Sequence, residues 1–296
     1  MTAAGVSSAT ASSAGSAQAF EFVKLLAREL SAGTVELPSF PDVALRVQRV
    51  LADDSVTPDR VVRVVGTEPA LASRILRMAN SVALNVSRVE VVDLRTAIAR
   101  MGFDMLRSAA LSFAMAQLRH AERYKPIAQQ MQQLWDQSMH IGAMCYVVAK
   151  RCTKLSPDSA MLSGVLHGVG KLYIMARAIE YPDLFNDPSS LNQIIADWHM
   201  NIAKALLENW GMAEELVAAV HAYEDQDATA KGPVTLTDVL ALGALLAAFD
   251  KSPALLAAKL VESRSAARLG VDAQSVTALL SESEEQLHSL LEALSA

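Results

Sequence analysis

The stretch from Leu162 to Leu172 most constrains what this chain can fold into. It has the pattern of an apolar helix that carries a single histidine, His167, and then meets glycines at positions 168 and 170. Glycine in a helix interior costs roughly 1 kcal/mol relative to alanine, so these two glycines indicate a specific requirement for space or for backbone freedom. Whether that requirement is structural or chemical depends on the rest of the chain.

The composition predicts an all-α protein. Of the 296 residues, 52% are hydrophobic but only 5% are aromatic, with 13 Gly and 10 Pro. Sheets favour β-branched and aromatic residues between dense turn signals, and this sequence does not have that profile. The length is sufficient for one large domain or two modest ones with a buried core.

Helix signals divide the chain into five parts. Residues 1–18 are Ala, Ser, Gly and Thr without periodicity and are predicted to be a disordered tail. Residues 19–35 are predicted to be a helix that docks on the main body. An N-terminal helical bundle is expected over 36–124, a second helical half over 125–248, and a C-terminal helical extension over 249–296.

Capping and breaking residues predict several helix ends. Asp93 is expected to cap a helix that Gly102 closes. Asp187 is expected to cap a helix that runs through Trp198, and a separate helix is expected around Ile202.

Charge is distributed unevenly along the chain, whose formal net charge is -6. Residues 37–125 hold 13 Lys/Arg against 9 Asp/Glu, whereas residues 126–296 hold 11 against 20. The acidic segment Glu224–Gly232 is predicted to be a loop. The basic excess of the first part is too dilute to predict nucleic-acid binding, although it permits a local anionic partner.

The cysteines and the hydropathy favour a cytoplasmic protein. Cys145 and Cys152 share a helix face seven residues apart, which does not position them for a disulfide bridge and fits a reducing compartment. Mean hydropathy is +0.24, but the longest apolar run, Val239 to Phe249, is too short for a membrane span. The N-terminus has no signal-peptide pattern, so we expect no membrane association.

Ordered motifs in both halves are similar to those of a known family. They are Leu37-Pro38 with Pro41, Glu68 to Ser81, Ala97 to Gly102, Trp135 with Ser138, Gly164 to Leu172, His199, Trp210 and His221. Together they resemble the HDOD family, the bacterial "HD-related output domain", over roughly residues 37–248. The resemblance implies bacterial signal transduction and control of gene expression.

The resemblance also implies a relationship to the HD phosphohydrolases, helical enzymes that gather His and Asp around one or two metal ions. Such a site needs a His on the long helix, a His-Asp pair and a further Asp, because the ion requires several ligands and an activated water. Here Gln137 stands in place of the first His, and Gly168 in place of the Asp beside His167. Glutamine is a poor ligand for transition metals and glycine has no side chain, so we predict no metal, no cofactor and no catalysis.

The candidate site is the groove that the lost metal centre would leave. Its predicted lining is Gln137, His167, Gly168, Lys171, His199 and His221. A lone His167 on an apolar helix is interpreted as a hydrogen-bonded core residue. Two other interpretations stay open: a three-histidine zinc site made by residues 167, 199 and 221, and His140 as a substitute ligand. Lys171 near a helix start would suit an anion.

We therefore predict a non-catalytic regulatory output module that binds a regulatory protein partner, or a small nucleotide-like ligand, through this groove. One alternative is a metal-dependent phosphohydrolase or cyclic-dinucleotide phosphodiesterase. The other is a nucleic-acid-binding regulator, which is less favoured because arginine pairs spaced three apart also occur on ordinary solvated helix faces. The pairs are Arg46/Arg49, Arg60/Arg63 and Arg74/Arg77.

Overall fold

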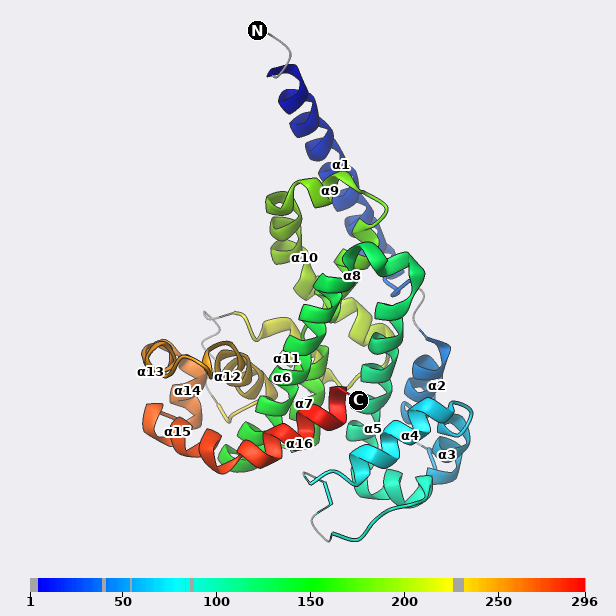
Figure 1. The fold of residues 1–296 in the computed structure, drawn as a ribbon, viewed down its shortest axis with the longest axis vertical. Helices are drawn as coiled ribbons and strands as arrows, with labels where there is room; N and C mark the ends of the chain where they lie inside the picture. The colour runs from blue at the N-terminus through cyan, green and yellow to red at the C-terminus, as the bar shows by residue number, and fades with distance from the viewer. Residues whose placement is uncertain are drawn as a thin grey trace.

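The fold is built from helices, and a long connection separates α4 from α5 (Figure 1). The computed structural model describes residues 5–38, 41–53, 55–82, 84–85, 88–225 and 232–295, and within these ranges there are α-helices, one 3-10 helix and no strand. The all-α prediction is thus confirmed. The division of the chain into five parts remains a prediction.

Helix α1 (Gly5–Ala32) begins well before the predicted start near residue 19. In the structure this helix includes residues 5–18, for which the sequence predicts a disordered tail. Residues 1–4 lie outside the described residues. The C-terminal part of α1 buries Phe22 and Leu26, and the helix ends at Gly33, whose φ of 65° is the left-handed conformation that glycine adopts most easily.

Four helices form the N-terminal bundle: α2 (Asp42–Leu51), α3 (Pro58–Val65), α4 (Pro69–Ala79) and α5 (Leu94–His120). Asp93 caps α5 by accepting a hydrogen bond from the backbone N–H of Thr96, as predicted. Gly102 interrupts α5 with φ 74° and ψ 173°, so the chain kinks where the sequence predicted a helix end.

The second half holds the 3-10 helix η1 (Glu122–Ile127) and seven α-helices. They are α6 (Ala128–Cys152), α7 (Pro157–Leu166), α8 (Val169–Ala178), α9 (Asp183–Asn186), α10 (Pro188–Asn209), α11 (Glu214–Ala222) and α12 (Leu236–Phe249). Asp187 caps α10 as predicted, but the two helices expected after it are one. No Gly or Pro separates Trp198 from Ile202, and buried residues continue the same helical stripe from Leu191 to Leu207.

Glycines bring the central helices unusually close together. A Cβ added to Gly164 of α7 would lie 2.6 Å from Cα of Gly142 on α6, so neither backbone leaves room for a side chain there. A Cβ on Gly170 of α8 would lie 2.0 Å from the carbonyl oxygen of His199 on α10. Close backbone contact therefore positions the helices around His167 and His199.

The C-terminal extension packs on the second half. It contains α13 (Pro253–Glu262), α14 (Arg264–Leu269), α15 (Ala273–Glu282) and α16 (Glu284–Ser295). Helix α16 lies against α6, and α12 contacts both α13 and α14 (Figure 1). The predicted breaks at Ser252-Pro253 and Gly270 are present, and Gly270 is left-handed with φ 66°.

Candidate functional site

His167 occupies the corner between α7 and α8. Its side chain is 1% exposed, and its Nδ1–H donates to the carbonyl of Gly164 at 2.7 Å. Its ring meets that of Tyr223 edge to face, with the centroids 5.9 Å apart. Burial lowers the pKa of His167 to about 4, so the imidazole is neutral near pH 7. Its Nε2 is buried without a hydrogen-bond partner among the described residues.

Glu224 holds the site together from the turn after α11. Its Oε1 lies 3.2 Å from Nζ of Lys171 and accepts a hydrogen bond from the Tyr223 hydroxyl at 2.5 Å, and its Oε2 lies 3.3 Å from Nε2 of His199. The hydrogen bond from His199, with smaller effects of Tyr223 and Lys171, holds the pKa of Glu224 well below its usual range. A carboxylate that stays ionised thus anchors residues from α8, α10 and α11.

The structure brings only some of the predicted site residues together. Lys171 and His199 meet at Glu224, and His167 is packed against Tyr223. Gln137 is exposed on α6. His221 lies outside this cluster, with its Nε2 3.2 Å from Oδ1 of Asn201.

Glu224 itself is a site residue that was not predicted. The sequence placed it in an acidic loop, and the signal that could have singled it out was its position next to Tyr223 at the end of a predicted helix. Carboxylates in acidic loops are usually solvated, so the predicted loop did not favour a site residue at this position.

The residues present do not fit the metal site of HD enzymes. A Cβ at Gly168 would lie 2.8 Å from Cδ1 of Leu134 and 3.1 Å from the hydroxyl oxygen of Ser138, both on α6. A side chain at position 168 would therefore require Leu134 to move, and the glycine itself offers a metal no ligand. Within the described part of the chain no three His, Cys, Asp or Glu side chains are grouped to hold a metal, which argues against the three-histidine zinc site.

His140, the other candidate ligand, faces the C-terminal end of α12. Its Nε2 lies 3.2 Å from Oδ2 of Asp250. This contact gives His140 a structural role between α6 and α12.

The arginine pairs do not form a continuous basic surface. Arg74 is 3% exposed, so it cannot reach a phosphate on a nucleic acid. Arg46 is paired with Asp42 at 3.0 Å, and Arg60 with Asp53 at 2.5 Å. Three of the six paired arginines are therefore buried or held in intramolecular ion pairs.

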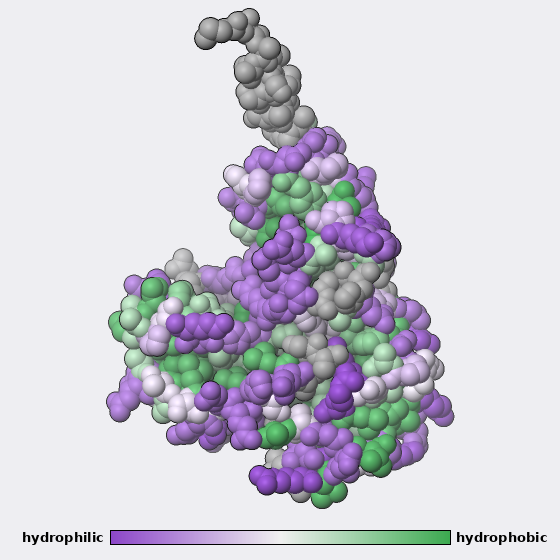
Figure 2. Space-filling model, in the orientation of Figure 1, coloured by the Kyte–Doolittle hydropathy of each residue, from purple (hydrophilic) through white to green (hydrophobic). Residues whose placement is uncertain are grey.

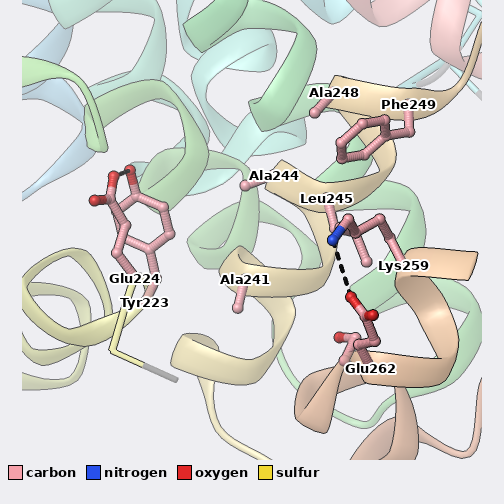
Figure 3. A pocket seen from close by; sticks show the side chains of 10 residues that line it. Tyr223, Glu224, Ala241, Ala244, Leu245, Ala248, Phe249, Lys259 and Glu262 are labelled. Atoms are coloured by element: carbon pink, nitrogen blue, oxygen red, sulfur yellow. Dashed lines mark hydrogen bonds and ion pairs between the residues drawn. The ribbon is translucent and has the colours of Figure 1, made fainter. Parts of the chain in front are cut away.

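A groove of about 520 Å³ borders the Glu224 cluster (Figure 3). Its floor is the face of α12 that carries three alanines together with Leu245 and Phe249, and its far wall is α13. An ion pair of 2.9 Å between Lys259 and Glu262 lies on that wall. We call this cavity the α12 groove; its lining is Tyr223, Glu224, Ala241, Ala244, Leu245, Ala248, Phe249, Lys259, Glu262 and Ser263.

Comparison with known proteins identifies the family. The family model described as "HDOD domain" matches residues 37–226, which is more than half of the chain. The chain belongs to the HDOD family. The predicted resemblance is confirmed, and the match ends just after the Glu224 cluster. The HDOD region thus includes every residue of that cluster, whereas most of the α12 groove is built from helices beyond it.

Solved structures share the fold of this HDOD protein. A protein of Shewanella amazonensis SB2B, provisionally named a metal-dependent phosphohydrolase, is 23% identical with a TM-score of 0.74, covering 94% of this chain and 99% of its own. An HDOD domain protein of unknown function from Geobacter sulfurreducens is 22% identical with a TM-score of 0.60, covering 91% and 97%. At this level of identity the likeness establishes the fold alone.

One curated relative also matches this HDOD protein by sequence. An uncharacterised protein of Treponema pallidum (strain Nichols) is 21% identical over 202 residues, which are 62% of this chain and 37% of that protein. The chain therefore spans well under half the length of that relative. In the described part of the HDOD protein, no helix combines the length and the apolar character that a bilayer span requires.

Proposed function

We propose that this HDOD protein is a non-catalytic regulatory module of bacterial signal transduction that binds a protein partner through the α12 groove. The observation that carries the proposal is the Glu224 cluster. Lys171, His199 and Tyr223 all bond to one carboxylate, at the place where an HD enzyme would gather metal ligands. A site that is closed by the protein's own side chains, and in which position 168 is a glycine, supports binding over metal-assisted hydrolysis.

The α12 groove has the chemistry of a protein-binding surface. Its floor of small and apolar side chains would accept an apolar side chain from a partner, while Glu224 and the Lys259–Glu262 pair form a polar rim. An apolar centre inside a polar rim is the usual arrangement of protein interfaces. On α13, next to this rim, Val261 is 89% exposed, and Figure 2 shows apolar surface over the helices of the extension.

Photo-crosslinking in the native cytoplasm tests this function. The two free cysteines favour that compartment. A crosslinking amino acid at Ala244 in the groove is expected to capture one defined protein, and the same amino acid at exposed Ala70 on α4 is not. The Glu224→Lys variant should weaken capture from position 244. Equal capture from both positions, or none from position 244, would show that the groove is not the interface.

The second candidate function is metal-dependent phosphohydrolysis, favoured by the name of the Shewanella structure with the same fold. It is tested by elemental analysis of the purified protein and by hydrolysis of phosphomonoesters and cyclic dinucleotides. Stoichiometric metal together with activity that His167→Ala abolishes would replace our proposal. We expect neither, because Gly168 and Gln137 supply no ligands.

A further inference from the structure

A second cavity of about 500 Å³ lies where the N-terminal bundle meets the second half. We call it the α2–α10 pocket. Its lining comes from the segment after α1, from α2 and from the end of α10: Val35, Glu36, Leu37, Leu45, Gln48, Arg49, Ala52, Asn209, Trp210 and Gly211. Asn209 ties these parts together because its Nδ2 donates to the carbonyl of Val35 at 3.1 Å. The volume is that of a small-molecule site.

Gln48 is the feature of this pocket that points to a ligand. Its side chain lines the cavity but is only 3% exposed, and its Nε2 has no hydrogen-bond partner among the described residues. Buried amide groups are nearly always hydrogen-bonded, so this one calls for a partner. Rotation about its last side-chain bond turns either a donor or an acceptor toward the cavity.

The two charged residues of the pocket suit two further chemical groups of a ligand, a phosphate and a sugar hydroxyl. Arg49 is exposed and makes no ion pair with a described residue, unlike Arg46 one turn earlier, which is paired with Asp42. A guanidinium binds phosphate well through paired N–H groups. Glu36 is also exposed on the lining, and a carboxylate accepts hydrogen bonds from sugar hydroxyls.

We propose that the α2–α10 pocket binds a nucleoside monophosphate, with the base edge on Gln48, the ribose at Glu36 and the phosphate at Arg49. A glutamine amide matches the paired donor and acceptor of a nucleobase edge, and purines present such a pair. The apolar walls, including Leu37 and Leu45, would bury the flat faces of the base. This site is separate from the α12 groove, so the proposal does not depend on the partner-binding function.

Such a ligand would connect two parts of the fold. It would touch α2 on one side and the end of α10 on the other, and α10 also carries His199 of the Glu224 cluster. Binding would therefore brace the helix that supports the cluster and stabilise the whole chain against unfolding.

Calorimetric titration of the full chain with AMP, GMP, CMP and UMP tests the proposal. We expect a purine monophosphate to bind, adenosine or guanosine to bind at least about tenfold more weakly, and Arg49→Gln to cause a loss of about tenfold as well. Arg63→Gln is the matched control, since Arg63 is also exposed, on α3, and is not among the residues that line the pocket. Gln48→Leu should remove the preference between bases.

Two results would overturn the proposal. One is the absence of heat and of any melting shift with all four nucleotides at about 5 mM. The other is nucleotide binding that Arg49→Gln leaves unchanged. If Gln48→Leu fails to fold, the exposed Arg49→Gln variant still decides the question, because a surface substitution leaves the core intact.

Discussion

Nε2 of His199 lies 3.3 Å from Oε2 of Glu224, joining the middle of α10 to the turn after α11. The same carboxylate receives Lys171 from α8 and the hydroxyl of Tyr223. A single ionised side chain thus joins residues from α8, α10 and the end of α11.

Replacing the Glu224 carboxylate is expected to destabilise the fold. Glu224→Gln keeps the shape of the side chain but removes the negative charge that His199 and Lys171 contact. Because Glu224 is partly exposed, we expect the free energy of unfolding to fall by about 1–2 kcal/mol. Urea unfolding at pH 7 measures this free energy. The control is Glu208→Gln, whose partner Lys204 is 3.9 Å away on the exposed side of α10, and which should change stability by less than about 0.5 kcal/mol. Equal effects of the two variants would contradict a special role for Glu224.

The buried His167 should make the fold sensitive to acid. Its pKa is lowered from 6.5 to about 4, so between these values the unfolded chain binds more protons, and stability is lost as the pH falls. Asparagine does not titrate in this range, so the His167→Asn variant no longer has this source of acid sensitivity. Between pH 6.5 and 4 its free energy of unfolding should fall less than that of the unaltered protein, by up to about 3 kcal/mol. Unfolding curves across this range test the prediction, and parallel pH dependences would refute it.

The glycines at 168 and 170 should differ in their tolerance of a side chain. Gly170→Ala would drive a methyl group into the backbone carbonyl of His199, which cannot move aside, and we expect a loss of about 3 kcal/mol or more. Gly168→Ala meets the end of the flexible Leu134 side chain and should cost about 1 kcal/mol. Thermal and urea unfolding measure both variants. A larger cost at 168 than at 170 would mean that the contact between α8 and α10 is not the tighter one.

Glu29 is expected to hold α1 on the second half. It is 8% exposed and accepts hydrogen bonds from the Tyr173 hydroxyl and the Arg177 guanidinium of α8, and burial raises the pKa of Tyr173 to about 12. Glu29→Ala leaves the partly buried Arg177 without its main partner, so we expect a loss of about 3 kcal/mol. Glu21→Ala, which removes an exposed pair with Lys24, is the control and should have little effect. Hydrogen exchange should show whether α1 is released; protection that is unchanged in Glu29→Ala would argue against docking through Glu29.

Asp158 should change the pH dependence of folding stability in the opposite direction to His167. Burial, and secondarily the charge of Asp104, raises its pKa to about 6, so the folded state binds more protons than the unfolded state between pH 3.8 and that value. Asp158→Asn should therefore stabilise the protein at pH 7 by about 1 kcal/mol, after allowance for partial exposure, and this gain should disappear below about pH 4. A gain that does not depend on pH would point to a cause other than ionisation.

The sequence by itself determined the helical class and the family. Periodicity and capping act over a few residues, which is why Asp93, Gly102 and Gly270 could be assigned from local patterns. Local signals are weaker in the Ala- and Ser-rich stretch without periodicity, where the sequence predicts disorder and the structure has the first part of α1. The glycine at position 168, which has no side chain to bind a metal, could be identified from the motif Gly164 to Leu172 alone.

Only the tertiary structure decided which side chains meet at Glu224. Lys171 and Glu224 are separated by 53 residues, and their contact exists because α8 approaches α10 closely enough at Gly170 for the turn after α11 to reach both. The α2–α10 pocket likewise depends on segments that are distant in the chain, joined where Asn209 meets Val35. Contacts of this kind follow from the packing of whole helices, which local propensity and spacing do not encode.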